Sequence, residues 1–175
     1  MRTGRTAPVV VYAFRMQRKR FELWHSILGV VVLLAGEAAV LRTLGSVLGE
    51  TAVLLGASIG GAGIIFVATE VIEEVRNARR MLFLLTAIVF EFILFFGFQY
   101  GYLLHFVPGA FQGLSADPLS VLLQSAMVFV FNPLYTPVTV TGKALLLLNT
   151  AEALILVFFV LQNIWQFRTR TFTNS

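Results

Sequence analysis

Three carboxylates lie inside long apolar stretches of the sequence. Glu37, Glu91 and Glu152 are surrounded by Leu, Val, Phe, Ala and Ile residues. A charge held near the middle of a membrane costs at least about 2.5–3.5 kcal/mol, so such side chains face a bundle interior or water. We expect them to be protonated, hydrogen-bonded to polar neighbours such as Asn149 and Thr150, or bound to a cation. Interhelical hydrogen bonding and a cation or proton path are both open interpretations.

The composition indicates the solvent in which these carboxylates lie. Of 175 residues, 58% are hydrophobic and 13% are charged, whereas a soluble domain carries roughly a quarter charged residues. A water-soluble core of this size could not bury so many Phe, Leu and Val side chains, so we predict an integral membrane protein in a lipid bilayer. The sequence contains no cysteine, which excludes disulfides and thiolate metal sites.

Motifs of soluble catalysis are missing from the sequence. It has no phosphate-binding glycine loop, no hydrolase elbow and no zinc helix motif. The basic residues cluster beside apolar segments, where they set membrane topology, which argues against nucleic-acid binding. We therefore predict a protein that is not an enzyme and that has no cofactor or metal centre.

Four apolar segments are long enough to cross a bilayer core of about 30 Å, which takes roughly 20 helical residues. These predicted spans are residues 23–41, 52–72, 81–106 and 144–165. Residues 118–131 are also apolar but too few to span easily, and they fit a re-entrant or interfacial helix. The predicted fold class is an all-α integral membrane protein with four transmembrane helices and one re-entrant pore-type helix.

The basic residues orient these segments. If residues 118–131 re-enter, eleven basic residues lie on one side of the membrane, and Arg42 and Lys143 lie on the other. The positive-inside rule then places both termini in the cytoplasm, and we expect the plasma (inner) membrane. The eleven are Arg2, Arg5, Arg15, Arg18, Lys19, Arg20, Arg76, Arg79, Arg80, Arg168 and Arg170.

The chain divides into four predicted parts. Residues 1–22 form a basic cytoplasmic segment, either an amphipathic interfacial helix or a disordered tail. Residues 23–80 form a two-helix hairpin with a cytoplasmic basic loop. Residues 81–166 contain a span, the short helix, a loop and the last span, and residues 167–175 form a cytoplasmic tail.

Small residues form one face of the second predicted span. Gly56, Gly60 and Gly63 follow at steps of four and three residues. Because glycine has no side chain, a neighbouring helix can approach closely and gain dispersion contacts. This face predicts helix packing within one protomer or, alternatively, a dimerisation surface.

Turn residues stand between the short apolar helix and the last span. Residues 81–166 resemble the pore module of the potassium-channel superfamily, in which an outer helix precedes a pore helix, a filter, a short loop and an inner helix. The resemblance implies a channel-like homo-oligomer, tetrameric as in that family, and monovalent cations as partners. Its post-filter loop residues are Tyr135, Thr136, Pro137, Thr139 and Gly142.

The resemblance places the selectivity filter on residues 129–134, where the sequence departs from the family pattern. Only Val130 is retained from the series threonine, valine, glycine, aromatic, glycine, aspartate. Pro133 fixes its φ near −65°, so the potassium carbonyl ladder cannot form. The alternatives are a different permeation site, a gate formed by phenylalanines, or plain packing. The filter-like residues are Phe129, Val130, Phe131, Asn132, Pro133 and Leu134.

Three functions follow from these features. The first is an ion-channel-like membrane protein, either a weakly selective or a non-conducting cation channel homologue. The second is a structural or partner-binding membrane subunit that uses the glycine face. The third is a proton- or cation-coupled carrier that uses the midplane glutamates.

Overall fold

A computed structural model of the chain shows an all-helical protein. It describes residues 28–29, 31–32, 34–36, 38–39, 46–73 and 78–172. The helices in this part are α2 (Ser46–Glu73), α3 (Ala78–Phe106), α4 (Pro118–Phe129) and α5 (Val140–Phe172). Within the described residues, α2, α3 and α5 are long and apolar enough to cross a membrane, which indicates a membrane-embedded protein.

The last three predicted spans are confirmed as helices, and each helix is longer than its apolar core. Polar residues such as Glu50, Arg79 and Thr141 continue the helices beyond the predicted limits, because a helix satisfies its own backbone hydrogen bonds at the membrane surface. The first predicted span and the basic residues 1–22 lie largely outside the described residues, as does Glu37. The described residues between positions 28 and 39 are helical.

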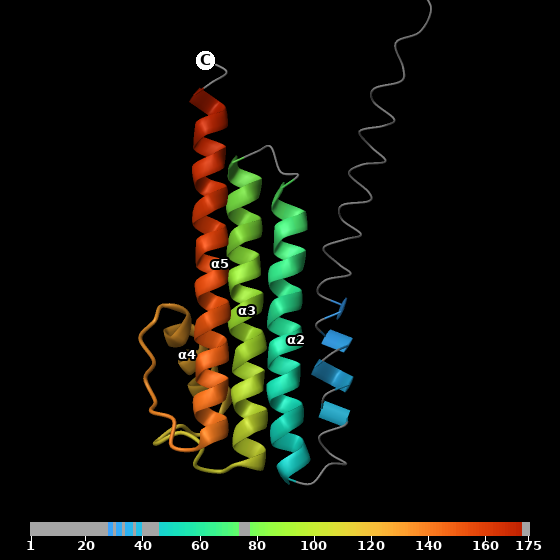
Figure 1. The fold of residues 1–175 in the computed structure, drawn as a ribbon, viewed down its shortest axis with the longest axis vertical. Helices are drawn as coiled ribbons and strands as arrows, with labels where there is room; N and C mark the ends of the chain where they lie inside the picture. Colours follow the sequence, from blue (N-terminus) through green and yellow to red (C-terminus); the bar gives the residue numbers. More distant parts are fainter. Residues whose placement is uncertain are drawn as a thin grey trace, which may run out of the picture.

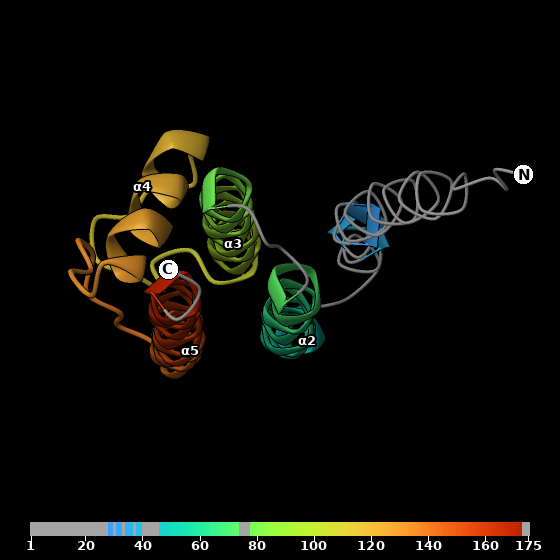
Figure 2. The ribbon, with the colours of Figure 1, turned by 90° about the horizontal axis from the view of Figure 1, so that it is seen from above.

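The three long helices form an up–down–up bundle (Figure 1). Helix α3 runs antiparallel to α2 and α5, so that the end of α3 and the start of α5 lie at the same end of the molecule. Helix α4 packs against α3 and α5, on the side of the bundle away from α2 (Figure 2). The short helix is therefore an addition to one flank of a three-helix core.

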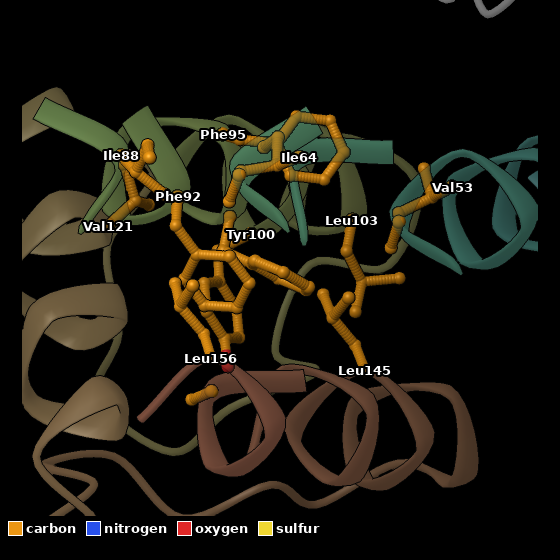
Figure 3. Packing of buried hydrophobic residues seen from close by; sticks show 14 of the residues in the cluster. Val53, Ile64, Ile88, Phe92, Phe95, Tyr100, Leu103, Val121, Leu145 and Leu156 are labelled. Atoms are coloured by element: carbon orange, nitrogen blue, oxygen red, sulfur yellow. The ribbon is translucent and has the colours of Figure 1, made fainter. Parts of the chain in front are cut away.

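Aromatic rings on one face of α3 fill the centre of the bundle. Phe92, Phe96 and Tyr100 follow at steps of four residues, which places them above one another on a helix. The ring centroids of Phe92 and Phe96 are 4.8 Å apart. Leu145 and Leu156 of α5 meet this face (Figure 3). Because lipid is as apolar as these side chains, close packing rather than escape from water holds the helices together.

Candidate functional site

Helix α4 and the chain that follows it form a hairpin on the flank of the bundle. Helix α4 has 12 residues, against 29 in α3, and it is about 18 Å long. The chain then turns and runs back beside α4 to the start of α5 (Figure 1). Near its end it pairs with the α3–α4 connection, since Gln112 N donates to Thr136 O at 2.9 Å and Val138 N to Ala110 O at 2.8 Å. Both arms of the hairpin therefore start and finish at one end of the bundle.

The sequence before α4 fixes where the helix begins. Asp117 is the N-cap, and its Oδ1 accepts a hydrogen bond from Ser120 N at 2.9 Å. Pro118 follows at the first helical position, where its missing N–H has no cost. The Ser115 hydroxyl and Ser120 N donate to the Asp117 carboxylate. Ser115 first and then Ser120 lower the pKa of Asp117 to about 2. The helix start is thus held by an ionised aspartate.

The chain after helix α4 contains a residue in the left-handed backbone conformation that is not glycine. Phe131 has φ 60°, a conformation that usually falls to glycine at the position after a helix. Phe131 N donates to Val128 O at 2.9 Å and Asn132 N to Met127 O at 2.8 Å, the two bonds of a Schellman motif. The chain thereby reverses direction within the filter-like segment.

Gln124 holds the returning chain against α4. Its Oε1 accepts hydrogen bonds from Leu134 N and from Tyr135 N, each at 3.1 Å. The Gln124 side chain is fully buried in the middle of an otherwise apolar helix. One buried amide oxygen thus satisfies two successive backbone donors.

The hydrogen bonds of the turn involve its N–H groups rather than its carbonyls. None of the bonds described above uses a carbonyl of residues 129–135 as acceptor. In a trans peptide a carbonyl points opposite to the following N–H. The N–H groups of Leu134 and Tyr135 point at Gln124, so the carbonyls of Pro133 and Leu134 point away from α4. The side chains of residues 130–134 are exposed, so the turn presents a polar backbone edge outside the protomer.

The predicted post-filter residues join this hairpin to α5. The Thr139 hydroxyl caps α5 by accepting from Gly142 N at 3.0 Å. A Cβ added to Gly142 would lie 2.7 Å from the carbonyl oxygen of Ala110, so this junction needs glycine. Pro137 forms an isolated bridge with Phe111. These residues build the base of the hairpin, whereas the backbone N–H of Tyr135 is held against α4 by Gln124.

A buried polar group lies behind the turn, and sequence reasoning did not assign it a role. Asn149 Nδ2 of α5 donates to the Tyr100 hydroxyl of α3 at 3.1 Å, and both side chains are fully buried. The Gln124 Nε2 is also buried, and it makes no hydrogen bond. A glutamine inside a 12-residue apolar helix is the sequence signal that could have revealed this group.

The carboxylates predicted near the membrane middle lie in separate surroundings. Glu152 is 8% exposed and lies against Gly61 of α2, where any side chain would collide with its carboxyl group. Its predicted neighbours bond elsewhere: Asn149 to Tyr100, and the Thr150 hydroxyl to Leu146 O at 2.8 Å. Atoms Glu152 Oε2 and Glu91 Oε1 are buried without a hydrogen-bond partner.

No ion pair or hydrogen bond joins Glu91 to Glu152 in the part of the chain that the structure describes. Glu91 is partly buried, and Glu37 lies outside the described residues. Among those residues, no three carboxylate or histidine side chains gather as metal ligands would. A shared carboxylate site therefore has no observed contact to support it.

The predicted glycine face is partly covered within the protomer. The ring of Phe95 on α3 occupies the space that a Gly60 side chain would need. A side chain at Gly63 would meet nothing within 4 Å, and Gly56 is partly buried. The close approach expected from small residues occurs between α2 and its neighbours α3 and α5 at Gly60 and Gly61.

Comparison with models of protein families, with curated proteins and with solved structures finds no match for this chain. Its function must therefore be argued from the geometry of the hairpin. That geometry combines a short helix, an exposed turn with outward carbonyls, and a buried amide that holds the turn in place.

Proposed function

We propose that the chain is an ion-channel-like membrane protein whose copies assemble around a water-filled axis lined by residues 129–135. The observation that carries this proposal is the polar edge of the turn, with its carbonyls directed away from α4. Helix α4 enters the bilayer in this arrangement as a re-entrant helix and the chain leaves on the same side. Residues 23–41 supply a fourth span.

The cost of placing this turn in lipid supports the proposal. Each backbone polar group without a partner in hydrocarbon costs several kcal/mol. Irregular backbone at membrane depth is therefore tolerated where protein covers it or where it lines a water-filled cavity. The side chains of residues 130–134 are exposed on the protomer, so cover must come from further copies and water. A ring of identical turns around an axis meets both needs.

Carbonyl oxygens favour cations as the permeating species. They carry partial negative charge and can replace part of an ion's hydration shell. Pro133 prevents the regular ladder of a potassium filter, so we propose weak selectivity among monovalent cations. A turn that closes completely would give a non-conducting homologue with the same architecture.

The two phenylalanines of the filter-like segment have different surroundings. The Phe129 ring packs against Phe92, with ring centroids 6.0 Å apart. Phe131 is 46% exposed. We assign to Phe131 the role of a hydrophobic constriction, which can close a pore by excluding water, and to Phe129 a packing role.

The ends of the helices support a cytoplasmic location for both termini. Arg79 and Arg80 lie in the first turn of α3, at the end of the bundle where α5 finishes (Figure 1). The sequence of α5 carries Arg168 and Arg170 near that same end. Lys143 lies at the opposite end, at the start of α5. The positive-inside rule assigns the arginine-rich end to the cytoplasm.

The cysteine-free sequence allows a direct test. Asn132→Cys places one thiol in the exposed turn, and Phe90→Cys places one on the exposed face of α3, 62% exposed in the protomer. Purified variants in liposomes are exposed to a water-soluble, positively charged thiol reagent, and potassium and sodium flux is recorded. Oligomeric mass is measured in detergent. We expect the reagent to modify position 132 and reduce flux, and to leave position 90 unmodified.

The alternative outcomes separate the remaining functions. A thiol at position 132 that never reacts, in a protein that stays monomeric, would place the turn in lipid and refute the pore. Reaction at position 132 in an oligomer that conducts at no voltage would identify the non-conducting homologue. Oxidative cross-linking between Asn132→Cys protomers would show that the turns of neighbouring copies meet.

A further inference from the structure

We propose that Gln124 is the positioning residue of the turn. Its effect on ion flux rests on the proposed function, whereas its effect on the turn does not. The proposal concerns one side chain of α4, which is fully buried.

The direction of the carbonyls follows from the two bonds at Gln124 Oε1. Leu134 N and Tyr135 N both point at this oxygen, at 3.1 Å each. Peptide planarity then directs the Pro133 and Leu134 carbonyls to the opposite side. Pro133 itself has no N–H that could anchor the chain. Gln124 therefore anchors the two residues that follow Pro133, Leu134 and Tyr135.

Burial explains why an amide is required at this position. A glutamine in an apolar helix loses its hydration, which is unfavourable unless hydrogen bonds replace it. Here the oxygen makes two such bonds with groups that would otherwise lie unpaired at membrane depth. A side chain of equal length without an acceptor would fill the space and leave both N–H groups without a partner.

A separate buried hydrogen bond joins α3 to α5. The Tyr100 hydroxyl accepts from Asn149 Nδ2 at 3.1 Å. Gln124 Nε2 makes no hydrogen bond, so Gln124 acts on the turn through its Oε1 alone.

Two substitutions of similar size distinguish the effect of the hydrogen-bond acceptor from the effect of side-chain volume. Gln124→Met keeps the length and removes the acceptor, and Gln124→Glu keeps two acceptor oxygens. Hydrogen exchange of the Leu134 and Tyr135 amides is measured in detergent micelles. We expect about tenfold faster exchange or more in Gln124→Met, because a buried donor loses its partner, and slow exchange retained in Gln124→Glu. Unchanged exchange in Gln124→Met would overturn the proposal.

Two tyrosine variants serve as controls. Tyr100→Phe and Tyr102→Phe, two residues apart on α3, leave the Gln124 acceptor in place, and the same two amides should exchange slowly in both. If Gln124→Met fails to fold, the wild-type protein decides the case, because fast exchange of the Leu134 and Tyr135 amides there would overturn the proposal.

Flux measurements separate this proposal from the proposed function. If the wild-type oligomer conducts, Gln124→Met should shift its potassium-to-sodium permeability ratio, whereas Gln124→Glu should keep slow amide exchange. A wild-type protein that never conducts, but whose amides respond as expected, would exclude the conducting form of the proposed function and keep the positioning role. Conduction by the wild type, combined with unchanged amide exchange in Gln124→Met, would support the pore and overturn the positioning role of Gln124.

Discussion

Phe131 adopts a backbone conformation that is unfavourable for residues other than glycine. Its φ of 60° lies in the left-handed region, which costs roughly 1–2 kcal/mol for a residue with a Cβ. Such cost persists where the surrounding structure or a function requires the side chain. Phe131 completes the Schellman turn after α4 and is 46% exposed, so packing inside the protomer covers only part of this residue.

Replacing Phe131 should therefore separate stability from function. We expect Phe131→Gly to raise the free energy of unfolding by roughly 0.5–1 kcal/mol, as strain relief exceeds the entropy that glycine loses. Phe131→Leu keeps the strain and should give no increase. Unfolding in mixed detergent micelles measures both. A lower stability of Phe131→Gly would mean that the ring contributes more by packing than its backbone costs. In the proposed pore, the glycine variant should also leak more ions.

Asp117 gives a pH dependence that can be assigned to one residue, because it is the single aspartate in the sequence. Hydrogen bonds from Ser115 and Ser120 lower its pKa to about 2 in the folded protein, against about 3.9 in an unfolded chain. Its contribution to stability is therefore complete above about pH 4 and is lost as pH falls toward 2.

A carbon-13 aspartate label should show one carboxyl resonance that titrates near pH 2. In Ser115→Ala the midpoint should rise toward the ordinary value, because the largest stabilising hydrogen bond is removed. A wild-type midpoint close to 3.9 would contradict the capping arrangement at the start of α4.

At the scale of secondary-structure elements, Gly142 lies at the junction between the hairpin and α5. An added Cβ would contact a backbone oxygen, that of Ala110, at 2.7 Å, and a backbone cannot move aside as a side-chain tip can. We expect Gly142→Ala to lower the free energy of unfolding by about 1–3 kcal/mol, as overpacking does. It should also loosen the pairing of residues 110–112 with residues 136–139.

Gly63→Ala is the control for this substitution, since nothing lies within 4 Å of the added Cβ. It should leave stability unchanged or raise it by up to about 1 kcal/mol, because alanine favours a helix. Both variants are compared by unfolding in mixed micelles. Equal stability of the two would show that the α5 junction can relax without cost.

At the scale of the whole molecule, the hairpin decides the topology. Gln112 and Lys143 precede and follow it and are both exposed. Because α4 returns, we expect Gln112→Cys and Lys143→Cys to react with an impermeant maleimide from the same side of sealed vesicles. Arg80→Cys should react from the opposite side. Labelling of positions 112 and 143 from opposite sides would mean that residues 113–142 cross the membrane and that both termini cannot be cytoplasmic.

Hydropathy predicted the long helices because it depends on neighbouring residues alone. Helices α2, α3 and α5 each contain a long, predominantly apolar stretch, and the short stretch that became α4 was recognised by its length. The ends of the helices were less predictable. Polar residues such as Glu50 and Thr141 continue helices, and here they also meet one another, since the Thr141 hydroxyl donates to Glu50 at 2.5 Å.

The candidate site was predicted in part. The segment of residues 129–142 was identified from its prolines, threonines and glycine, but its residues divide between an exposed turn and a structural base. The roles of Gln124 and Tyr100 were missed because hydrogen-bond partners far apart in sequence leave no local pattern. Two of the predicted carboxylates showed the converse: Glu91 and Glu152 share a similar depth by sequence, yet no hydrogen bond or ion pair joins them among the described residues.

The sequence by itself indicated a membrane-embedded protein, predicted that its long segments are helices and showed that residues 118–131 are too few to span easily. Composition and length decide these properties, because lipid admits only apolar surfaces and internally bonded backbone. Only the tertiary structure decided which way the turn faces. That direction depends on Gln124 meeting Leu134 and Tyr135, a contact that exists once the chain has folded back on α4.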